Sequence, residues 1–347
     1  MAEESLFDLV PEELRERLVG HPSYRASQIW QGAYRDLAAG YDGIMTLPLR
    51  LRRELADALP FPVLEPVEEL ASPDRRTRKT LFRLGDGETI EAVTMEFHDR
   101  CTACVSSQIG CPVGCPFCAT GQSGFLRNLT AGEIVAQVLH AARQLRGVGR
   151  TLSHVVYMGM GEPMLNLDAV LRSIRILNDP EGFGLGARSF TVSTAGVVPG
   201  IDRLADEQPQ VNLAVSLHAS KDSLRDRLVP LNRRYPIPRL LEACRRYLEV
   251  THRRITFEFA LIDGVNDGID DARAAARLLS DLLCHVNLIA YNPTGGSSSQ
   301  RSPRDRVDAF GRVLSAAGIS VTIRRPMGLE IEAGCGQLRA RRNRRSP

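Results

Sequence analysis

Three cysteines, Cys111, Cys115 and Cys118, follow one another with the spacing C-x3-C-x2-C on a segment rich in Gly and Pro. Thiolates are soft ligands that suit iron–sulfur clusters or zinc. A [4Fe–4S] cluster contains four irons, so three cysteine ligands leave one iron open to a substrate. The alternative is a structural zinc loop in which Cys101 or Cys104 supplies a fourth thiolate. The spacing, and the alternation of strands and helices that follows it, favour the cluster.

Glycine and polar residues lie at the ends of four more predicted strands. They are Gly161 and Glu162, Ser193, Ser216 with Leu217 and His218, and Asn292. In a barrel of parallel strands these ends meet at one mouth, where ligands bind. Glycine lets the backbone approach a ligand closely, and a carboxylate such as Glu162 can accept a hydrogen bond from an ammonium group. Each residue alone would be interpreted as a turn cap, but four strand ends together indicate a ligand pocket.

The elements that must position these residues alternate regularly from residue 104 onward. The expected strands are 105–109, 154–158, 190–193, 212–217, 256–261, 286–290 and 320–323. The expected helices are 131–145, 169–177, 199–207, 237–249, 271–283 and 304–316. Such alternation predicts a parallel sheet with right-handed crossovers. The fold class is therefore α/β, an open or partial (β/α)6-type barrel with one extra strand.

The chain before the cysteine motif divides into two parts. Residues 1–60 predict helices at 11–18, 27–36 and 47–59, because apolar residues recur there at helical spacing. Residues 61–100 begin with prolines and then predict strands at 80–84 and 89–97 around a Gly-Asp-Gly turn. We therefore expect four segments. They are a helical accessory domain (1–60), a β-rich connection (61–100), the barrel (101–330) and a C-terminal segment (331–347).

Composition excludes several classes of protein. The 347 residues are 43% hydrophobic and 24% charged, which excludes a disordered chain. No apolar run reaches the length of a membrane span, and residues 1–10 are acidic and lack the apolar core of a signal peptide. Five of the eight cysteines fall between 101 and 118, which in such a chain indicates metal binding or catalysis. We expect a cytoplasmic protein without membrane contact.

Blocks of sequence spread over nearly the whole chain resemble the RlmN family of radical S-adenosylmethionine (SAM) RNA adenine methyltransferases. The blocks are Tyr24-Arg-Ala-Ser-Gln-Ile-Trp30, Cys104-Val-Ser-Ser-Gln-Ile-Gly-Cys111, Arg127-Asn-Leu-Thr130, Met158-Gly-Met-Gly-Glu-Pro163, Ser193-Thr-Ala-Gly-Val-Val-Pro199, Ser216-Leu-His-Ala219, Val286-Asn-Leu-Ile289 and Cys335-Gly-Gln-Leu338. The resemblance implies methylation of carbon 2 of a specific adenosine in 23S rRNA, and also in tRNA. The related Cfr enzymes share most of these blocks, so methylation at carbon 8 is the alternative.

The resemblance also implies a mechanism, because an adenine ring carbon is not a nucleophile and needs a radical route. Cys335 takes a methyl group from one SAM. A second SAM, cleaved at the single [4Fe–4S] cluster, yields a 5′-deoxyadenosyl radical that removes a hydrogen from this methyl group. The carbon radical adds to adenine and forms a protein–RNA thioether, which Cys104 resolves by forming a disulfide bond with Cys335. Glu91, thirteen residues before Cys104, matches the proposed general base.

The partners follow from the same resemblance. The helical N-terminal region is the expected RNA-docking element, and an electron donor such as flavodoxin is expected to reduce the cluster. The protein is expected to be a monomer. We also hypothesise phosphate contacts from a basic group formed by Arg75, Arg76, Arg78 and Lys79, with a solvated loop as the alternative. The Arg-rich tail at 339–345 is interpreted as a solvated tail, with phosphate contacts as the alternative.

Overall fold

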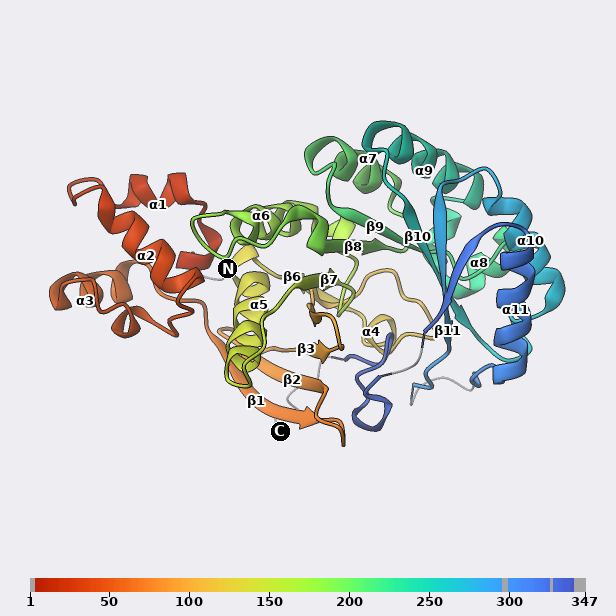
Figure 1. Ribbon diagram of the computed structural model, residues 1–347, viewed down its shortest axis with the longest axis horizontal. Helices are drawn as coiled ribbons and strands as arrows, with labels where there is room; N and C mark the ends of the chain where they lie inside the picture. The colour runs from red at the N-terminus through yellow and green to blue at the C-terminus, as the bar shows by residue number, and fades with distance from the viewer. Residues whose placement is uncertain (1–3, 295–298, 325–326, 340–347) are drawn as a thin grey trace.

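The computed structural model describes residues 4–294, 299–324 and 327–339. Within them, one ten-stranded sheet runs in the order β1-β2-β3-β4-β7-β8-β9-β10-β11-β12. The sheet curves into an open barrel that helices cover on the outside, and a group of helices lies beside it at the N-terminal end (Figure 1). This confirms the predicted α/β class. Residues 340–347, which include most of the Arg-rich tail, lie outside the described residues.

The N-terminal part contains α1 (Pro11–Arg17), α2 (Tyr24–Tyr34) and α3 (Leu49–Ala58), which confirms the three predicted helices. Helix α2 begins three residues earlier than expected. Apolar side chains from all three helices pack into the main hydrophobic core, because each helix presents one apolar stripe. Pro11 occupies the first turn of α1, where its missing N–H costs no hydrogen bond.

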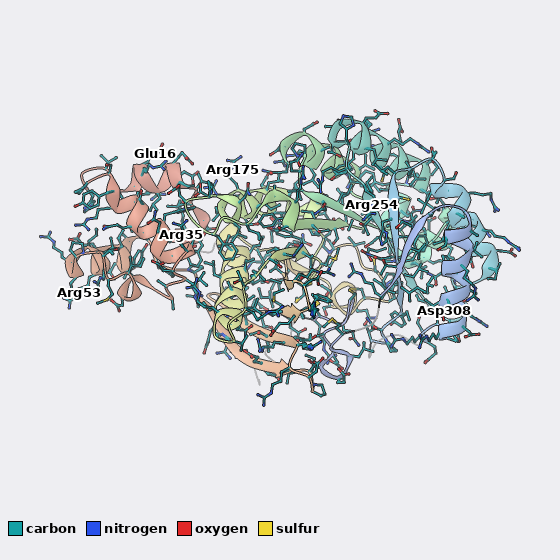
Figure 2. The ribbon with its side chains drawn as sticks, viewed as in Figure 1. Glu16, Arg35, Arg53, Arg175, Arg254 and Asp308 are labelled. Atoms are coloured by element: carbon teal, nitrogen blue, oxygen red, sulfur yellow. The ribbon has the colours of Figure 1, made fainter. Side chains whose placement is uncertain are left out.

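Hydrogen bonds fasten this helical part to the barrel. The indole of Trp30 donates to the carboxylate of Asp179 at 3.0 Å. The guanidinium of Arg143 donates to two backbone carbonyls just after α2, at 2.9 and 2.8 Å. Arg35 and Arg53 are exposed, and Arg53 lies at the outer end of the helical part (Figure 2). The docked helices therefore present basic side chains to solvent.

Four strands lead from the helices into the barrel: β1 (Leu64–Ala71), β2 (Thr77–Leu84), β3 (Thr89–Glu96) and β4 (Cys101–Cys104). Each pairs antiparallel with the next, and β4 then pairs parallel with the first inner strand, so the sheet is continuous. Strand β1 begins within the proline-rich stretch and was not expected. Its Pro66 sits at a register shift on the edge of the sheet, a position where proline costs no ladder hydrogen bond.

The inner strands are parallel and confirm the predicted alternation. The strands are β7 (His154–Tyr157), β8 (Phe190–Thr194), β9 (Asn212–Ser216), β10 (Ile255–Leu261), β11 (Cys284–Ala290) and β12 (Ser320–Ile323). The helices are α4 (Ala119–Gln122), α5 (Ala131–Arg146), α6 (Leu167–Asn178), α7 (Val198–Glu207), α8 (Asp222–Leu228), α9 (Ile237–Thr251), α10 (Ile269–Leu279) and α11 (Arg304–Ala316). Helix α8 was not expected. No described helix has both the length and the apolar character that crossing a membrane requires.

The strand predicted at 105–109 is wrong. The first parallel strand of the barrel is β4, which ends at Cys104. The chain then turns, because the N–H groups of Ser107 and Gln108 both donate to the carbonyl of Met160 instead of to a strand. Residues Gln108–Gly110 form β5, which pairs with β6 (Phe125–Asn128) in a separate hairpin. This hairpin brackets the three-cysteine loop.

Candidate active site

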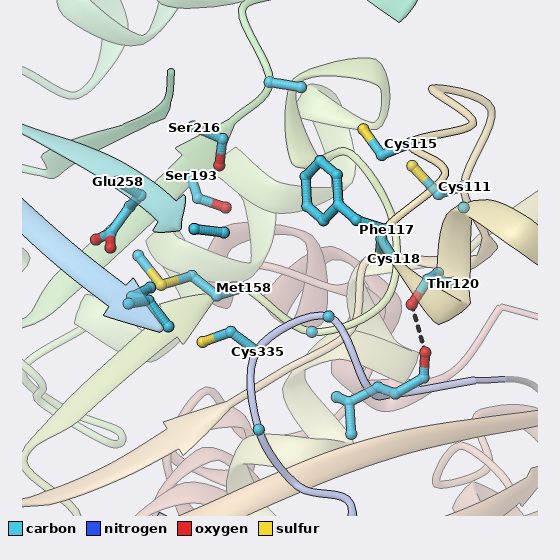
Figure 3. Close-up of a pocket in the computed structure, with 18 of the residues that line it drawn as sticks. Cys111, Cys115, Phe117, Cys118, Thr120, Met158, Ser193, Ser216, Glu258 and Cys335 are labelled. Atoms are coloured by element: carbon cyan, nitrogen blue, oxygen red, sulfur yellow. Dashed lines mark hydrogen bonds between the residues drawn. The ribbon is translucent and has the colours of Figure 1, made fainter. Parts of the chain in front are cut away.

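A cavity at the carboxyl ends of the parallel strands gathers most of the predicted residues (Figure 3). The predicted residues that line it are Cys104, Cys111, Cys115, Cys118, Gly161, Glu162, Ser193, Ser216, His218, Asn292 and Cys335. They come from β4, from the loops after β5 and β7, from the ends of β8, β9 and β11, and from the C-terminal segment. The lining does not include two predicted residues, Leu217 and Glu91.

The three-cysteine loop forms one wall of this cavity, with Phe117 beside the thiols of Cys111 and Cys115 (Figure 3). Burial raises the pKa of the Cys111 thiol to about 12, so a bound metal must displace its proton. In the described part of the chain, no three His, Cys, Asp or Glu side chains converge as ligands of a single ion. Cys101 is buried in β4, away from the cavity lining. The donor set fits a [4Fe–4S] cluster, in which each thiolate binds a different iron.

A buried cation lies beside this loop. Arg225 on α8 is fully buried and donates to three backbone carbonyls at the ends of β8 and β9, and to the side chain of Asn232. Burial lowers its pKa to about 10, which still leaves it charged at neutral pH. Its charge interacts with Cys115, where it would offset the negative charge of bound thiolates. The sequence analysis missed Arg225 because α8 was not predicted.

Gly161 and Glu162 follow β7. Gly161 has a φ of +105°, and a Cβ there would lie 2.7 Å from Gln108, so glycine is required by packing as well as by conformation. The carboxylate of Glu162 is buried and accepts hydrogen bonds from the N–H groups of Met164 and Ala195, at 3.1 and 2.7 Å. Burial raises its pKa to about 7. An ammonium group in the cavity would stabilise its charged form, which is what the SAM amino group offers.

Ser193 near the end of β8 and His218 just after β9 also line the cavity. Burial lowers the pKa of His218 to about 3, so its ring is neutral. Its Nδ1 accepts a hydrogen bond from the N–H of Ala260 at 3.0 Å, which leaves Nε2 as the donor. Phe117 packs edge-to-face against this ring with centroids 5.1 Å apart. Leu217, in contrast, is fully buried within the hydrophobic core.

The C-terminal segment brings Cys335 to the cavity. The side-chain amide of Asn292 donates to the carbonyl of Cys335 at 3.2 Å, and the Oδ1 of Asn292 is buried without a partner. Helix α4, directly after Cys118, holds the next residues of the segment: the N–H of Ala119 donates to the carbonyl of Gly336 at 2.8 Å. The segment is thus attached to both the cluster loop and the end of β11. An orphaned amide oxygen at the cavity wall fits a ligand that donates hydrogen bonds.

Cys104 and Cys335 both face this cavity, and both are free. All eight cysteines are free, so the implied disulfide bond is not formed in this structure. Burial, followed by the nearby Cys335, raises the pKa of the Cys104 thiol to about 12. Desolvation likewise raises the pKa of the Cys335 thiol above its usual value. The charge of Arg324 lowers this pKa, and the charge of Glu258 raises it. Both cysteines are therefore thiols, not thiolates, until a base or a substrate is present.

The predicted basic group, of which two residues precede β2 and two lie within it, is only partly exposed to solvent. Lys79 is 4% exposed and pairs with the buried carboxylate of Glu91, with Nζ and Oε1 3.4 Å apart. Arg78 pairs with Glu96 on the neighbouring strand at 3.3 Å. The expectation that Lys79 contacts phosphates is wrong, because its side chain points under the C-terminal segment. Arg75 and Arg76 remain exposed.

Two cavity residues escaped the sequence analysis. Glu258 on β10 is buried, accepts from Asn287 at 2.8 Å through one oxygen, and has its other oxygen, Oε2, without a partner. Arg324, directly after β12, places a guanidinium nitrogen 3.6 Å from Glu258. A carboxylate inside an apolar parallel strand was an available signal, because such strands are normally buried on both faces.

Comparison with known proteins agrees with this geometry. Residues 105–279 match the model of the Radical SAM superfamily. A relative from Moorella thermoacetica, named "Probable dual-specificity RNA methyltransferase RlmN", is 48% identical over 95% of this chain and 96% of its own length. A relative of the same name from Frankia casuarinae is 52% identical over 96% of this chain and 82% of its own.

A solved structure gives the same result. The crystal structure of a radical SAM methyltransferase from Sphaerobacter thermophilus superposes with a TM-score of 0.96, at 56% sequence identity. The match covers 97% of this chain and 99% of that one. The match therefore includes the barrel and at least part of both the helical N-terminal part and the C-terminal segment.

Proposed function

This chain belongs to the RlmN family of radical SAM RNA methyltransferases, and we propose that it methylates carbon 2 of a specific adenosine in 23S rRNA and in tRNA. The relatives are named dual-specificity RNA methyltransferases, which supports two classes of RNA substrate. The observation that carries the proposal is the meeting of two further thiols, Cys104 and Cys335, with the three-cysteine loop around one cavity. A radical enzyme without a cysteine methyl carrier has no need of them.

The residues around the cavity would bind the cluster and SAM. Cys111, Cys115 and Cys118 would hold one [4Fe–4S] cluster, which supplies the electron for SAM cleavage when bound. Glu162 would bind the SAM ammonium group, with its carboxylate held in place by two backbone N–H groups. The neutral His218, with Nε2 as donor, and the orphaned oxygen of Asn292 are further groups that would orient SAM. Two SAM molecules would be consumed for each methyl group transferred.

The two remaining cysteines would carry the methyl group and release the product. Cys335 loses its proton and gains a methyl group as a thioether. After its methyl carbon has bonded to the adenine ring, Cys335 is joined to RNA by a carbon–sulfur bond. The Cys104 thiolate attacks the sulfur of Cys335 and forms a disulfide. The carbon leaves with the electron pair of the broken carbon–sulfur bond and takes up a proton, which makes it the methyl group on the adenine. External thiols then reduce the disulfide for the next cycle.

The surroundings of the site support further parts of the proposal. The helical N-terminal part has exposed arginines, Arg35 and Arg53 among them, which suit an RNA-docking element that binds phosphates (Figure 2). A small redox protein such as flavodoxin would deliver electrons. We propose that the protein works as a cytoplasmic monomer.

The experiment that tests the function is mass spectrometry of nuclease digests of rRNA and tRNA from a strain that lacks this gene. Restoring the gene should restore 2-methyladenosine in both RNA classes, and a Cys335→Ala gene should not. The appearance of 8-methyladenosine instead would show that the enzyme methylates carbon 8 and not carbon 2. The absence of any methylated adenosine that depends on this gene would refute the proposal.

A further inference from the structure

Lys79 and Glu91 form an ion pair buried between the sheet and the C-terminal segment. Their side chains are 4% and 1% exposed, and they lie on the same face of β2 and β3 at diagonal positions of the register. Removing two charges from water is costly, and their mutual attraction offsets that cost only when their remaining donors and acceptors are also bonded. The other contacts of this pair therefore indicate its role.

Both other contacts go to the segment that carries Cys335. Nζ of Lys79 donates to the backbone carbonyl of Glu332 at 3.2 Å. Oε2 of Glu91 accepts from the backbone N–H of Arg339 at 3.0 Å. These two backbone groups lie three residues before and four residues after Cys335. The guanidinium of Arg339 also reaches the carboxylate of Glu332, at 3.3 Å, so the two ends of the segment are joined to each other as well.

The middle of this segment has little stiffness of its own. Gly334 and Gly336 flank Cys335, and Gly336 has a φ of +82°. Glycine has the largest conformational freedom to lose when a chain is ordered. The centre is held by the hydrogen bonds that the carbonyls of Cys335 and Gly336 accept, and anchored ends restrict its remaining freedom. The buried pair supplies anchors at both ends, which a single hydrogen bond could not.

We propose that Lys79 and Glu91 are positioning residues that close the segment 332–339 and so hold the Cys335 thiol at the cavity wall. Both carboxylate oxygens of Glu91 are engaged in this way, one with Lys79 and one with Arg339, and the described cavity lining does not include Glu91. In this geometry Glu91 acts through the segment, and a role as the base that removes a proton from adenine is the alternative that the turnover experiment below distinguishes. The inference rests on the proposed role of Cys335 as methyl carrier.

Hydrogen exchange of the purified holoenzyme tests the anchoring directly. Lys79→Met and Glu91→Gln should each speed amide exchange in residues 329–339 by about ten- to a hundredfold, the equivalent of a lost hydrogen bond to a charged group. The double variant should exchange more slowly than either single variant, because it leaves no unpaired buried charge. The matched control is Glu96→Gln, which breaks the Arg78–Glu96 pair between the same strands and should leave exchange in 329–339 unchanged.

The products of turnover with SAM and RNA distinguish a positioning role of Glu91 from a role in proton transfer. If the pair positions Cys335, both single variants should yield less methylated RNA for each 5′-deoxyadenosine released, and neither should trap a protein–RNA adduct. The double variant should recover part of the ratio of methylated RNA to 5′-deoxyadenosine. A base at Glu91 predicts instead that Glu91→Gln alone accumulates adduct and that the double variant is not rescued. Unchanged exchange of residues 329–339 in both single variants would overturn the proposal. That result is independent of which RNA carbon is methylated, or whether any is.

Discussion

The guanidinium of Arg324 lies 3.6 Å from the carboxylate of Glu258, and this cation and this anion act on the same thiol, that of Cys335, with opposite sign. Arg324 lowers the pKa of Cys335 and Glu258 raises it, against a background in which burial raises it most. The pKa of the thiol proposed to carry the methyl group is therefore set partly by one residue on β10 and one directly after β12.

This relationship predicts opposite shifts in the reactivity of Cys335. Arg324→Met should move the pH midpoint of alkylation upward, because the thiolate loses a favourable charge. Glu258→Gln should move it downward, because the thiolate loses a repulsive one. The measurement is the rate of iodoacetamide modification of the Cys335 peptide by mass spectrometry across a pH series. Arg254→Met, an exposed arginine before β10, is the control, and shifts of the same sign in both variants would contradict the prediction.

The three-cysteine loop can be tested by iron content. Cys115→Ala should lose the cluster and with it all SAM cleavage, while the circular dichroism spectrum stays that of the folded barrel. The control is Cys284→Ala, at the start of β11 and outside the cavity lining, which should retain iron. Full iron content together with normal 5′-deoxyadenosine formation in Cys115→Ala would show that the ligands have been assigned wrongly.

Variants of the two cysteines proposed to be catalytic should fail in different ways. Cys335→Ala has no methyl carrier and should form no covalent complex with RNA. Cys104→Ala can still load the methyl group and bond it to adenine, but it has no thiol to break the carbon–sulfur bond. A denaturing gel of each variant from cells should show an adduct that resists reducing agent only for Cys104→Ala. Cys101→Ala, three residues away in β4 and off the cavity, should behave like the unaltered enzyme.

A partly buried histidine outside the site predicts a pH dependence of stability. His140 on α5 packs edge-to-face on Phe82 at 4.8 Å, its Nε2 has no partner, and burial lowers its pKa from 6.5 to about 4. The unfolded chain therefore binds a proton that the folded chain does not, so the free energy of unfolding falls as pH drops from 6.5 to about 4. The loss is at most about 3 kcal/mol.

Thermal unfolding midpoints in a pH series check this effect. His140→Leu should lose less stability than the unaltered protein as the pH falls through that window. His98→Leu, in an exposed turn between β3 and β4, should keep the original slope. Parallel curves for the unaltered protein and His140→Leu would mean that His140 is protonated in the folded state.

The sequence predicts the parallel part of the fold well, for a physical reason. Apolar strands that alternate with amphipathic helices bury a parallel sheet under helices, and the carboxyl ends of the parallel strands then lie at one edge. That reasoning located Glu162, Ser193, Ser216, His218 and Asn292 at one cavity. Leu217, next to two of them, is a core residue because side chains alternate along a strand.

Features that depend on distant contacts could not be found in this way. Lys79 looks like a surface lysine until the chain brings Glu332 to it, 253 residues later. The stretch after Cys104 is predicted to be a strand, yet the N–H groups of Ser107 and Gln108 bond to the carbonyl of Met160 in the turn after β7. Arg225 gives no sign of burial, because only the converging carbonyls of two strand ends make its burial tolerable.

Strand β1 has a consequence for how the molecule behaves at high concentration. An exposed sheet edge is a template on which another chain can add a strand, the first step of aggregation. Here the edge carries three glutamates, Glu65, Glu68 and Glu69, and Pro66 at an irregular register interrupts its pattern of free N–H and carbonyl groups. A second copy would meet both charge repulsion and a missing donor. Strand β1 is thereby protected against pairing edge to edge with β1 of a second molecule.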